Sequence, residues 1–125
     1  MMRTVLVVDD EAPICENLAA YLEDDGFDVQ IAHSGEEALR LVRAGLAVQV
    51  CILDLRLPGM DGNETAFALR RVVPGIRFLV HTGSTEYEPS PDLAHIRITP
   101  EHLFYKPVAD MSQLVRAVRL LCPVR

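Results

Sequence analysis

The stretch VLVVDDE at residues 5–11 places four apolar residues directly before three carboxylates. A continuous, Val-rich apolar run is typical of a strand buried on both faces, as the strands of parallel sheets are. The stretch VQVCILD at residues 48–54 is similar, because a mostly apolar run again ends on a carboxylate. The two stretches therefore predict two strands of a parallel sheet, each followed by acidic side chains.

Elsewhere, short apolar runs alternate with amphipathic segments. The expected strands are residues 5–8, 27–31, 48–53, 76–80 and 103–105. The expected helices run from about residue 13 to Gly26, from Ser34 to Gly45, from Asp61 to Val73 and from Met111 to Leu121. Ser34 and Glu37 have the spacing of a capping box at the start of the second helix. This alternation predicts a parallel sheet with helices on both faces.

The segment 84–100 is the least regular part of the sequence. Pro89, Pro91 and Pro100 interrupt it, with Ser and Glu between them. Because proline removes a backbone donor and fixes φ, we expect at most a short helix at residues 92–96. The whole pattern predicts an α/β fold, namely a doubly wound, five-stranded parallel sheet flanked by five helices, of which the fourth is short or distorted.

The composition fits a single globular domain spanning residues 1–125. Of the 125 residues, 50% are hydrophobic and 24% are charged, which excludes intrinsic disorder. The net charge is −6, from 12 Lys and Arg against 18 Asp and Glu. Such an acidic chain has no overall attraction to phosphate backbones or anionic lipid, so we expect no direct binding to nucleic acid and no membrane partner.

The cysteines and the N-terminus indicate a cytoplasmic protein. Cys15, Cys51 and Cys122 are odd in number and far apart, so they predict neither a disulfide framework nor a CxxC metal site. The apolar run at residues 5–8 is too short for a signal peptide or a membrane span. We therefore expect a soluble protein in a reducing compartment.

Polar residues follow most of the predicted strands. In an open parallel sheet, ligands bind at the carboxyl ends of the strands, so the side chains that follow those strands are expected to meet at one edge. They are Asp9, Asp10 and Glu11 after the first strand, Asp54 after the third, Thr82 after the fourth and Lys106 after the fifth. Each alone is more often a turn, a cap or a surface residue; their joint position at strand ends favours a site.

These residue types together indicate phosphoryl transfer. Clustered carboxylates disfavour joint ionisation unless a cation compensates them, and all-oxygen ligands suit Mg²⁺. A lysine ammonium and a threonine hydroxyl can both bind phosphoryl oxygens. A carboxylate can also act as a nucleophile and form an acyl phosphate. The residues therefore lead to the hypothesis of Mg²⁺-assisted phosphoryl transfer onto an aspartate.

The same residues resemble the receiver domain of two-component response regulators, which has a flavodoxin-like fold. The resemblance lies in VVDDE at residues 7–11, ILDLRLPGMDG at residues 52–62, Thr82 and the pair Lys106-Pro107. It covers nearly the whole chain, and the motifs occur in the family's order. Any one of them is weak, but together they are specific.

The resemblance implies a role for each motif residue. Asp54 would accept the phosphoryl group from a histidine kinase or a phosphotransfer protein. Asp10 would ligate Mg²⁺ directly and Asp9 mostly through water, with Asp54 and the backbone carbonyl of Arg56 completing the site. Lys106, before a cis proline bond, would pair first with Asp54 and then with the phosphoryl oxygens. Thr82 would move its hydroxyl onto the phosphoryl group and so change the following loop.

The chain also departs from the family pattern. Leu103 stands three residues before Lys106, where receivers commonly carry an aromatic side chain that moves with the threonine. The segment 84–100 replaces what is often a regular fourth helix, so the usual output face is expected to be atypical. Arg56 is long and cationic, and we expect it to influence how fast water attacks the acyl phosphate.

Two other functions compete with a phosphoacceptor that signals without turnover. A degenerate receiver would only mediate interactions, which the complete set of motif residues disfavours and Leu103 favours. An aspartyl-nucleophile phosphatase of the haloacid dehalogenase type needs a second carboxylate two residues after the nucleophile, where this chain has Arg56. No output domain is visible after Leu121, so the sequence fits either a stand-alone receiver or a module of a longer protein.

Overall fold

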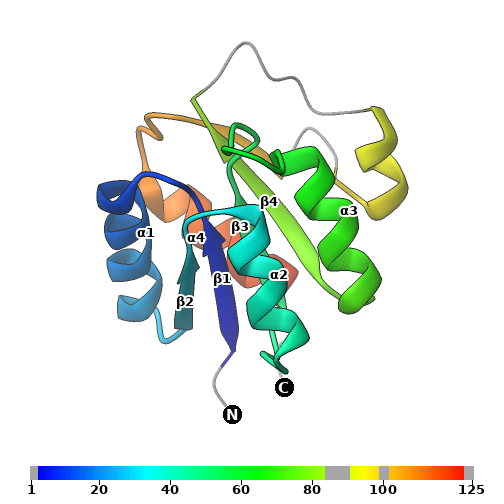
Figure 1. Cartoon of the computed structure of the whole chain (residues 1–125). Coiled ribbons are helices and arrows are strands. Elements are labelled where there is room, and N and C mark those ends of the chain that lie inside the picture. The colour runs from blue at the N-terminus through cyan, green and yellow to red at the C-terminus, as the bar shows by residue number, and fades with distance from the viewer. Residues whose placement is uncertain (1–2, 84–90, 99–101, 123–125) are drawn as a thin grey trace.

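The chain folds into one parallel sheet with helices on both faces (Figure 1). The computed structural model describes residues 3–83, 91–98 and 102–122. Its strands are β1 (Thr4–Val8), β2 (Asp28–Ala32), β3 (Val50–Leu53), β4 (Arg77–Thr82) and β5 (Leu103–Tyr105). All neighbouring strands are parallel, in the order β2-β1-β3-β4-β5. The prediction of a doubly wound, five-stranded parallel sheet is confirmed.

Within the described residues, four α-helices and a short 3₁₀ helix surround this sheet. They are α1 (Ala12–Asp24), α2 (Gly35–Arg43), α3 (Gly62–Val72), η1 (Pro91–Ile96) and α4 (Met111–Leu121). Helices α1 and α4 cover one face, and α2 and α3 cover the other, with η1 beside α3 (Figure 1). The expected short fourth helix is therefore the 3₁₀ segment η1. Pro89 and Pro100, on which that prediction also depended, lie outside the described residues.

The two central strands explain why the sequence reads as continuous apolar runs. Every residue of β3 is buried, as are Val5 to Val8 of β1. Alternate side chains enter opposite cores, because successive residues of a strand point to opposite faces. Leu6 and Leu53 belong to the core under α2 and α3, whereas Val7 and Ile52 belong to the core under α1 and α4. Both strands end at the same edge, directly before Asp9 and Asp54.

The capping box expected at α2 is present in part. The Ser34 hydroxyl accepts a hydrogen bond from the Glu37 N–H at 3.1 Å. The Glu37 carboxylate, however, accepts from the N–H of His33 at 3.1 Å and not from that of Ser34. A complete capping box occurs instead at α3, where Asp61 and Glu64 exchange both bonds. Asp61 and Glu64 were not recognised from the sequence as this second box.

Gly62 ties the start of α3 to the loop that follows Asp54. Its N–H donates to the Leu55 carbonyl at 2.8 Å. A Cβ at this position would lie 2.4 Å from both the Asp54 carbonyl oxygen and the Leu55 Cα. Because both contacts are backbone, neither could yield without moving the chain next to Asp54. A residue without a side chain is therefore required where α3 meets the edge of the sheet.

Within the described residues, no helix is long and apolar enough to cross a membrane. The three cysteines are free and buried, so the expectation that they form no disulfide is confirmed. Burial raises the pKa of the Cys51 thiol, which therefore stays protonated inside the core. Cys51 thus behaves as a small hydrophobic residue.

Candidate functional site

The carboxyl edge of the sheet brings together residues that are far apart in the sequence. Asp9 follows β1, Asp54 follows β3, Thr82 ends β4 and Lys106 follows β5. A cavity at this edge is lined by Asp10, Glu11, Asp54, Arg56, Gly83 and Lys106. The expectation that the strand-end residues meet at one edge therefore agrees with the structure.

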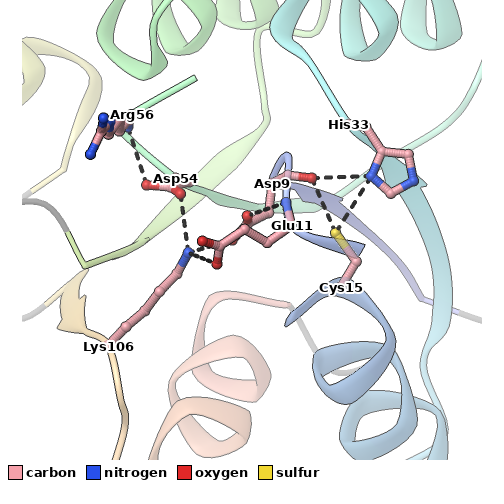
Figure 2. A network of polar contacts seen from close by, with 7 residues as sticks. All are labelled: Asp9, Glu11, Cys15, His33, Asp54, Arg56 and Lys106. Carbon is pink, nitrogen blue, oxygen red and sulfur yellow. Dashed lines mark hydrogen bonds and ion pairs between the residues drawn. The ribbon is translucent and has the colours of Figure 1, made fainter. Parts of the chain in front are cut away.

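The Lys106 ammonium lies among three carboxylates (Figure 2). Its Nζ is 2.8 Å from Asp9 Oδ2 and 3.1 Å from Asp54 Oδ2. A longer ion pair of 3.6 Å joins it to Glu11, whose side chain is largely exposed. The bond between Lys106 and Pro107 is cis. One cation thus links the ends of β1 and β3 from the far side of β4.

A main-chain hydrogen bond to β4 fixes the backbone position of Lys106. Its N–H donates to the carbonyl of Thr82 at 3.0 Å, which continues the pairing of β4 with β5 past the last residue of the strand. Thr82 itself is 2% exposed and is not among the residues that line the cavity. Across β4, Leu103 is opposite Val80 and Tyr105 is opposite Thr82. Leu103 is half-buried against the α2/α3 core, and Tyr105 is exposed.

Asp54 is held through both of its carboxylate oxygens. Oδ1 accepts from the N–H of Arg56 at 3.1 Å, and Oδ2 faces Lys106. Its own N–H donates to the carbonyl of Val8 at 3.0 Å, so the residue is anchored to the end of β1. Although Asp54 is only 6% exposed, it lines the cavity. Its carboxylate is therefore fixed in direction and accessible from one side.

The pKa values of Asp9 and Lys106 are both raised, but for different physical reasons. Burial raises the pKa of Asp9, and its contacts with Lys106 and the Glu11 N–H offset this rise only in part. Burial alone would lower the pKa of Lys106, but the hydrogen bonds that its ammonium donates to Asp9 and Asp54, together with the charges of these carboxylates, outweigh burial and leave the pKa raised. Lys106 therefore stays charged, and the edge carries more negative than positive charge.

The donor set fits a hard divalent cation. One carboxylate oxygen from each of Asp9, Asp10 and Asp54 lies within 4.8 Å of the other two. Asp9 and Asp54 are buried, while Asp10 is exposed at the cavity. Carboxylate oxygens beside open space that admits water suit Mg²⁺, which keeps several water ligands in proteins. Arg56 also lines the cavity, next to Asp54.

Two residues near the site were not anticipated from the sequence. His33 follows β2, and Cys15 lies on α1; both contact the backbone carbonyl of Asp9. The rule that pointed to the other strand ends also applies to β2, which ends at Ala32 on the same edge. That rule could have found His33. Nothing in the residue pattern marks Cys15 as a neighbour of Asp9.

His81 is a buried histidine on β4. It is 5% exposed, on the α1/α4 side of β4. Burial, followed by the nearby charge of Lys106, lowers its pKa to about 4. The imidazole is therefore neutral at physiological pH.

Comparison with known proteins gives consistent matches. The family model described as the response regulator receiver domain matches residues 5–119. A response regulator receiver protein from Anaeromyxobacter is 43% identical over 81 residues, which are 65% of this chain and 34% of that protein. The DNA-binding response regulator MtrA of Mycobacterium tuberculosis is 37% identical over 86 residues, covering 69% of this chain and 37% of MtrA. The chain thus spans about a third of the length of these relatives.

Solved structures agree with the sequence matches. A response regulator receiver protein from Pseudomonas putida shares 30% identity at a TM-score of 0.82, covering 96% of this chain and 98% of that one. The response regulator protein TrrA from Thermotoga maritima, solved in complex with Mg²⁺-BeF, shares 27% identity at a TM-score of 0.81. That match covers 97% of this chain and 100% of TrrA.

The position of Lys106 predicts the result of replacing it with methionine. Lys106→Met leaves Asp9 and Asp54 close together without the ammonium between them. We expect the free energy of unfolding at about pH 7 to fall by about 2 kcal/mol, less than for a fully buried pair because Lys106 retains some contact with water. Urea unfolding in buffer without divalent cations measures this loss.

The loss should shrink toward about pH 5, because the variant lacks the Lys106 contacts that lower the pKa of Asp9, so its folded state takes up a proton at a higher pH than the folded wild type does. Arg119→Met is the matched control, since it removes a 2.7 Å ion pair with Asp25 on the exposed surface. The control should show no comparable dependence on pH. A Lys106→Met deficit that is the same at both pH values contradicts this account of the edge.

Proposed function

The chain belongs to the response regulator receiver domain family, and from this membership we propose that it forms one receiver domain that is phosphorylated on Asp54. The proposed phosphoryl donor is a phosphohistidine on a histidine kinase or a phosphotransfer protein. An oxygen of Asp54 attacks the phosphorus, a P–O bond forms and the P–N bond to the donor imidazole breaks. The freed imidazole nitrogen takes a proton, and Asp54 becomes an acyl phosphate.

The observation that carries this proposal is the fixed, one-sided exposure of Asp54. The Arg56 N–H holds one carboxylate oxygen, and Lys106 contacts the other from 3.1 Å. The open side of the carboxylate faces the cavity. Holding the nucleophile in one orientation lowers the entropic cost of in-line attack. Lys106 is already within reach of any group added to Asp54 Oδ2, so its ammonium can pair with phosphoryl oxygens without a large movement.

We assign Mg²⁺ to the carboxylates of Asp9, Asp10 and Asp54, together with the backbone carbonyl of Arg56. The grouping of the carboxylate oxygens supports this assignment, as does the complex of TrrA with Mg²⁺-BeF. When bound, Mg²⁺ neutralises the charge that develops on the transferred group, which is the main catalytic requirement of a loose phosphoryl-transfer transition state. Lys106, with its ammonium 3.1 Å from Asp54 Oδ2, would supply the same kind of stabilisation.

We also propose that the phosphorylated chain acts as a signal and does not turn over a substrate as an enzyme does. Phosphorylation adds a charge of about −1.5 to −2 at Asp54. Thr82 is linked to Lys106 through its carbonyl, so a shift of Lys106 toward the phosphoryl group acts on the end of β4, and the Thr82 hydroxyl is proposed to follow. Because Leu103 replaces the aromatic residue usual in receivers, this response depends on Thr82 and the following loop.

The proposed partners are proteins. MtrA is named a DNA-binding response regulator, and this chain spans about a third of its length. We propose that an output domain or a downstream protein receives the signal, and that the acidic residues present here do not bind DNA themselves. Three free cysteines favour a reducing compartment, so we place the chain in the cytoplasm.

Phosphorylation of the purified protein tests the proposal. Incubation with acetyl phosphate and Mg²⁺ should add one phosphoryl group by intact mass, and EDTA should suppress the gain. Asp54→Asn should abolish it, because an amide oxygen is a poor nucleophile. Asp24→Asn, at the exposed end of α1, is the matched control and should be phosphorylated like the wild type. No gain in the wild type would favour a degenerate receiver that only binds partners.

Arg56 generates a second prediction about the same reaction. Its exposed side chain lines the cavity next to Asp54, where it restricts the approach of water. Excluding water slows hydrolysis of a reactive intermediate, so we expect Arg56→Ala to shorten the lifetime of phosphorylated Asp54 by roughly threefold. Loss of the phosphoryl group is followed by intact mass after removal of acetyl phosphate. Arg43→Ala, on the exposed side of α2, controls for the loss of a surface charge, and equal lifetimes in all three proteins would refute a role for Arg56.

A further inference from the structure

The backbone carbonyl of Asp9 receives two side-chain contacts, one from Cys15 and one from His33 (Figure 2). The Cys15 Sγ lies 3.2 Å from this oxygen, and the His33 Nδ1 also lies 3.2 Å from it. Cys15 comes from the first turns of α1, and His33 from the residue that follows β2. Sγ and Nδ1 are 4.0 Å apart, so the three groups form a small triangle behind the carboxylate cluster.

Both contacts are suited to donate a hydrogen bond to this carbonyl. The Cys15 thiol donates to the Asp9 carbonyl oxygen, with Sγ 3.2 Å from it. A carbonyl oxygen has two lone pairs and can only accept a hydrogen bond. The tautomer that fits this contact is therefore the one with the proton on His33 Nδ1. One acceptor can therefore satisfy two donors that come from different elements.

The remaining polar atoms of Asp9 are also held. Its N–H donates to the carbonyl of Ala32 at 3.1 Å. Its carboxylate accepts from the Glu11 N–H at 3.0 Å and contacts Lys106 at 2.8 Å. Cys15 and His33 complete this set, so both the main chain and the side chain of Asp9 are fixed. Because every polar atom of Asp9 has a partner, we expect the position of its backbone, as well as that of its carboxylate, to matter for the site.

Asp10 is the residue that depends most on this anchoring. The Asp9 carbonyl belongs to the peptide unit that joins Asp9 to Asp10, and that unit is planar. Fixing the carbonyl therefore fixes the plane from which the Asp10 side chain departs. Asp10 is exposed, and no hydrogen bond to another described residue holds its carboxylate. Its place near Asp9 and Asp54 is thus set by its backbone.

From these contacts we infer that His33 and Cys15 are positioning residues for the metal site. By holding the Asp9 carbonyl, they orient the Asp9–Asp10 peptide so that both carboxylates face Asp54. The inference rests on the proposed role of these carboxylates as Mg²⁺ ligands. It adds a requirement outside the ligand set: the affinity for Mg²⁺ depends on two side chains that do not touch the ion.

Calorimetric titration with Mg²⁺ tests the role of His33 without any phosphorylation. His33→Ala removes the donor, and we expect the affinity for Mg²⁺ to fall by about tenfold, the lower range for loss of a group that orients metal ligands. His33→Asn keeps an N–H donor at the same distance from the backbone and should restore most of the affinity. The hydrogen bond from the His33 N–H to Glu37 is made by the main chain, so both variants retain it.

Cys15 is tested in the same way. Cys15→Ala removes the thiol donor and should also weaken Mg²⁺ binding, whereas Cys15→Ser retains a hydroxyl donor and should bind more tightly than Cys15→Ala. Thermal unfolding without Mg²⁺ is measured for every variant, because Cys15 is buried and its replacement also alters packing. A positioning role predicts that affinity follows the presence of the donor, even where the variants are equally stable.

His95→Ala is the matched control, since His95 is an exposed histidine on η1. It should bind Mg²⁺ like the wild type. If the wild type binds Mg²⁺ and both alanine variants bind it equally well, the positioning role is refuted and the proposed function stands. Asparagine and serine variants as weak as the alanine variants would show that the effect is structural, which also refutes the inference. If the wild type itself binds no Mg²⁺, the proposed function fails and this inference with it.

Discussion

The ion pairs of Lys106 with Asp9 and Asp54 are the interaction on which the rest of the site depends. Two buried carboxylates at the ends of adjacent strands repel each other, and both are removed from most of the solvent that would screen them. The Lys106 ammonium offsets this repulsion from 2.8 Å and 3.1 Å. Its two hydrogen bonds in turn raise its own pKa against the effect of burial, so the cation persists.

The fold brings Lys106, Asp9 and Asp54 together at one edge of the sheet. The strand order places β1 and β3 next to each other at the centre of the sheet, with β5 beyond β4. The apolar runs of β1 and β3 are buried by helices on both faces, and the cavity lies at their carboxyl ends (Figure 1). Gly62 brings α3 against the backbone beside Asp54, and the Thr82 carbonyl fixes the start of Lys106. Packing of the whole domain therefore determines the geometry at one edge.

An edge of this kind is suited to respond to added charge. The carboxylates outnumber the ammonium, and the pKa of Asp9 is already raised by burial. A divalent cation would correct the imbalance, and a phosphoryl group on Asp54 would change it again and draw Lys106 toward its oxygens. Because the Lys106 N–H is hydrogen-bonded to the Thr82 carbonyl, such a change would reach the end of β4 in the proposed mechanism.

The sequence predicted most of the fold and the main residues at the edge, for a clear physical reason. Buried parallel strands need continuous apolar runs, and the polar residues that end them are visible as Asp9, Asp54 and Lys106. The positions of His33 and Cys15 could not be predicted fully, because they contact a backbone carbonyl and such an acceptor leaves no mark in the residue pattern. The capping box predicted that the Glu37 carboxylate accepts from the Ser34 N–H, but it accepts from the His33 N–H, one residue earlier. The choice between these two donors depends on local backbone geometry.

The central claim is that the reactive group at this edge is the carboxylate of Asp54. It is tested most directly by trapping the phosphorylated protein with borohydride, which reduces an acyl phosphate to an alcohol, and then locating the reduced residue by peptide mass spectrometry. The account predicts homoserine at position 54, formed only after treatment with acetyl phosphate and Mg²⁺. Homoserine at position 9 or 10 instead, or stable phosphate on a serine, threonine or histidine, would contradict it.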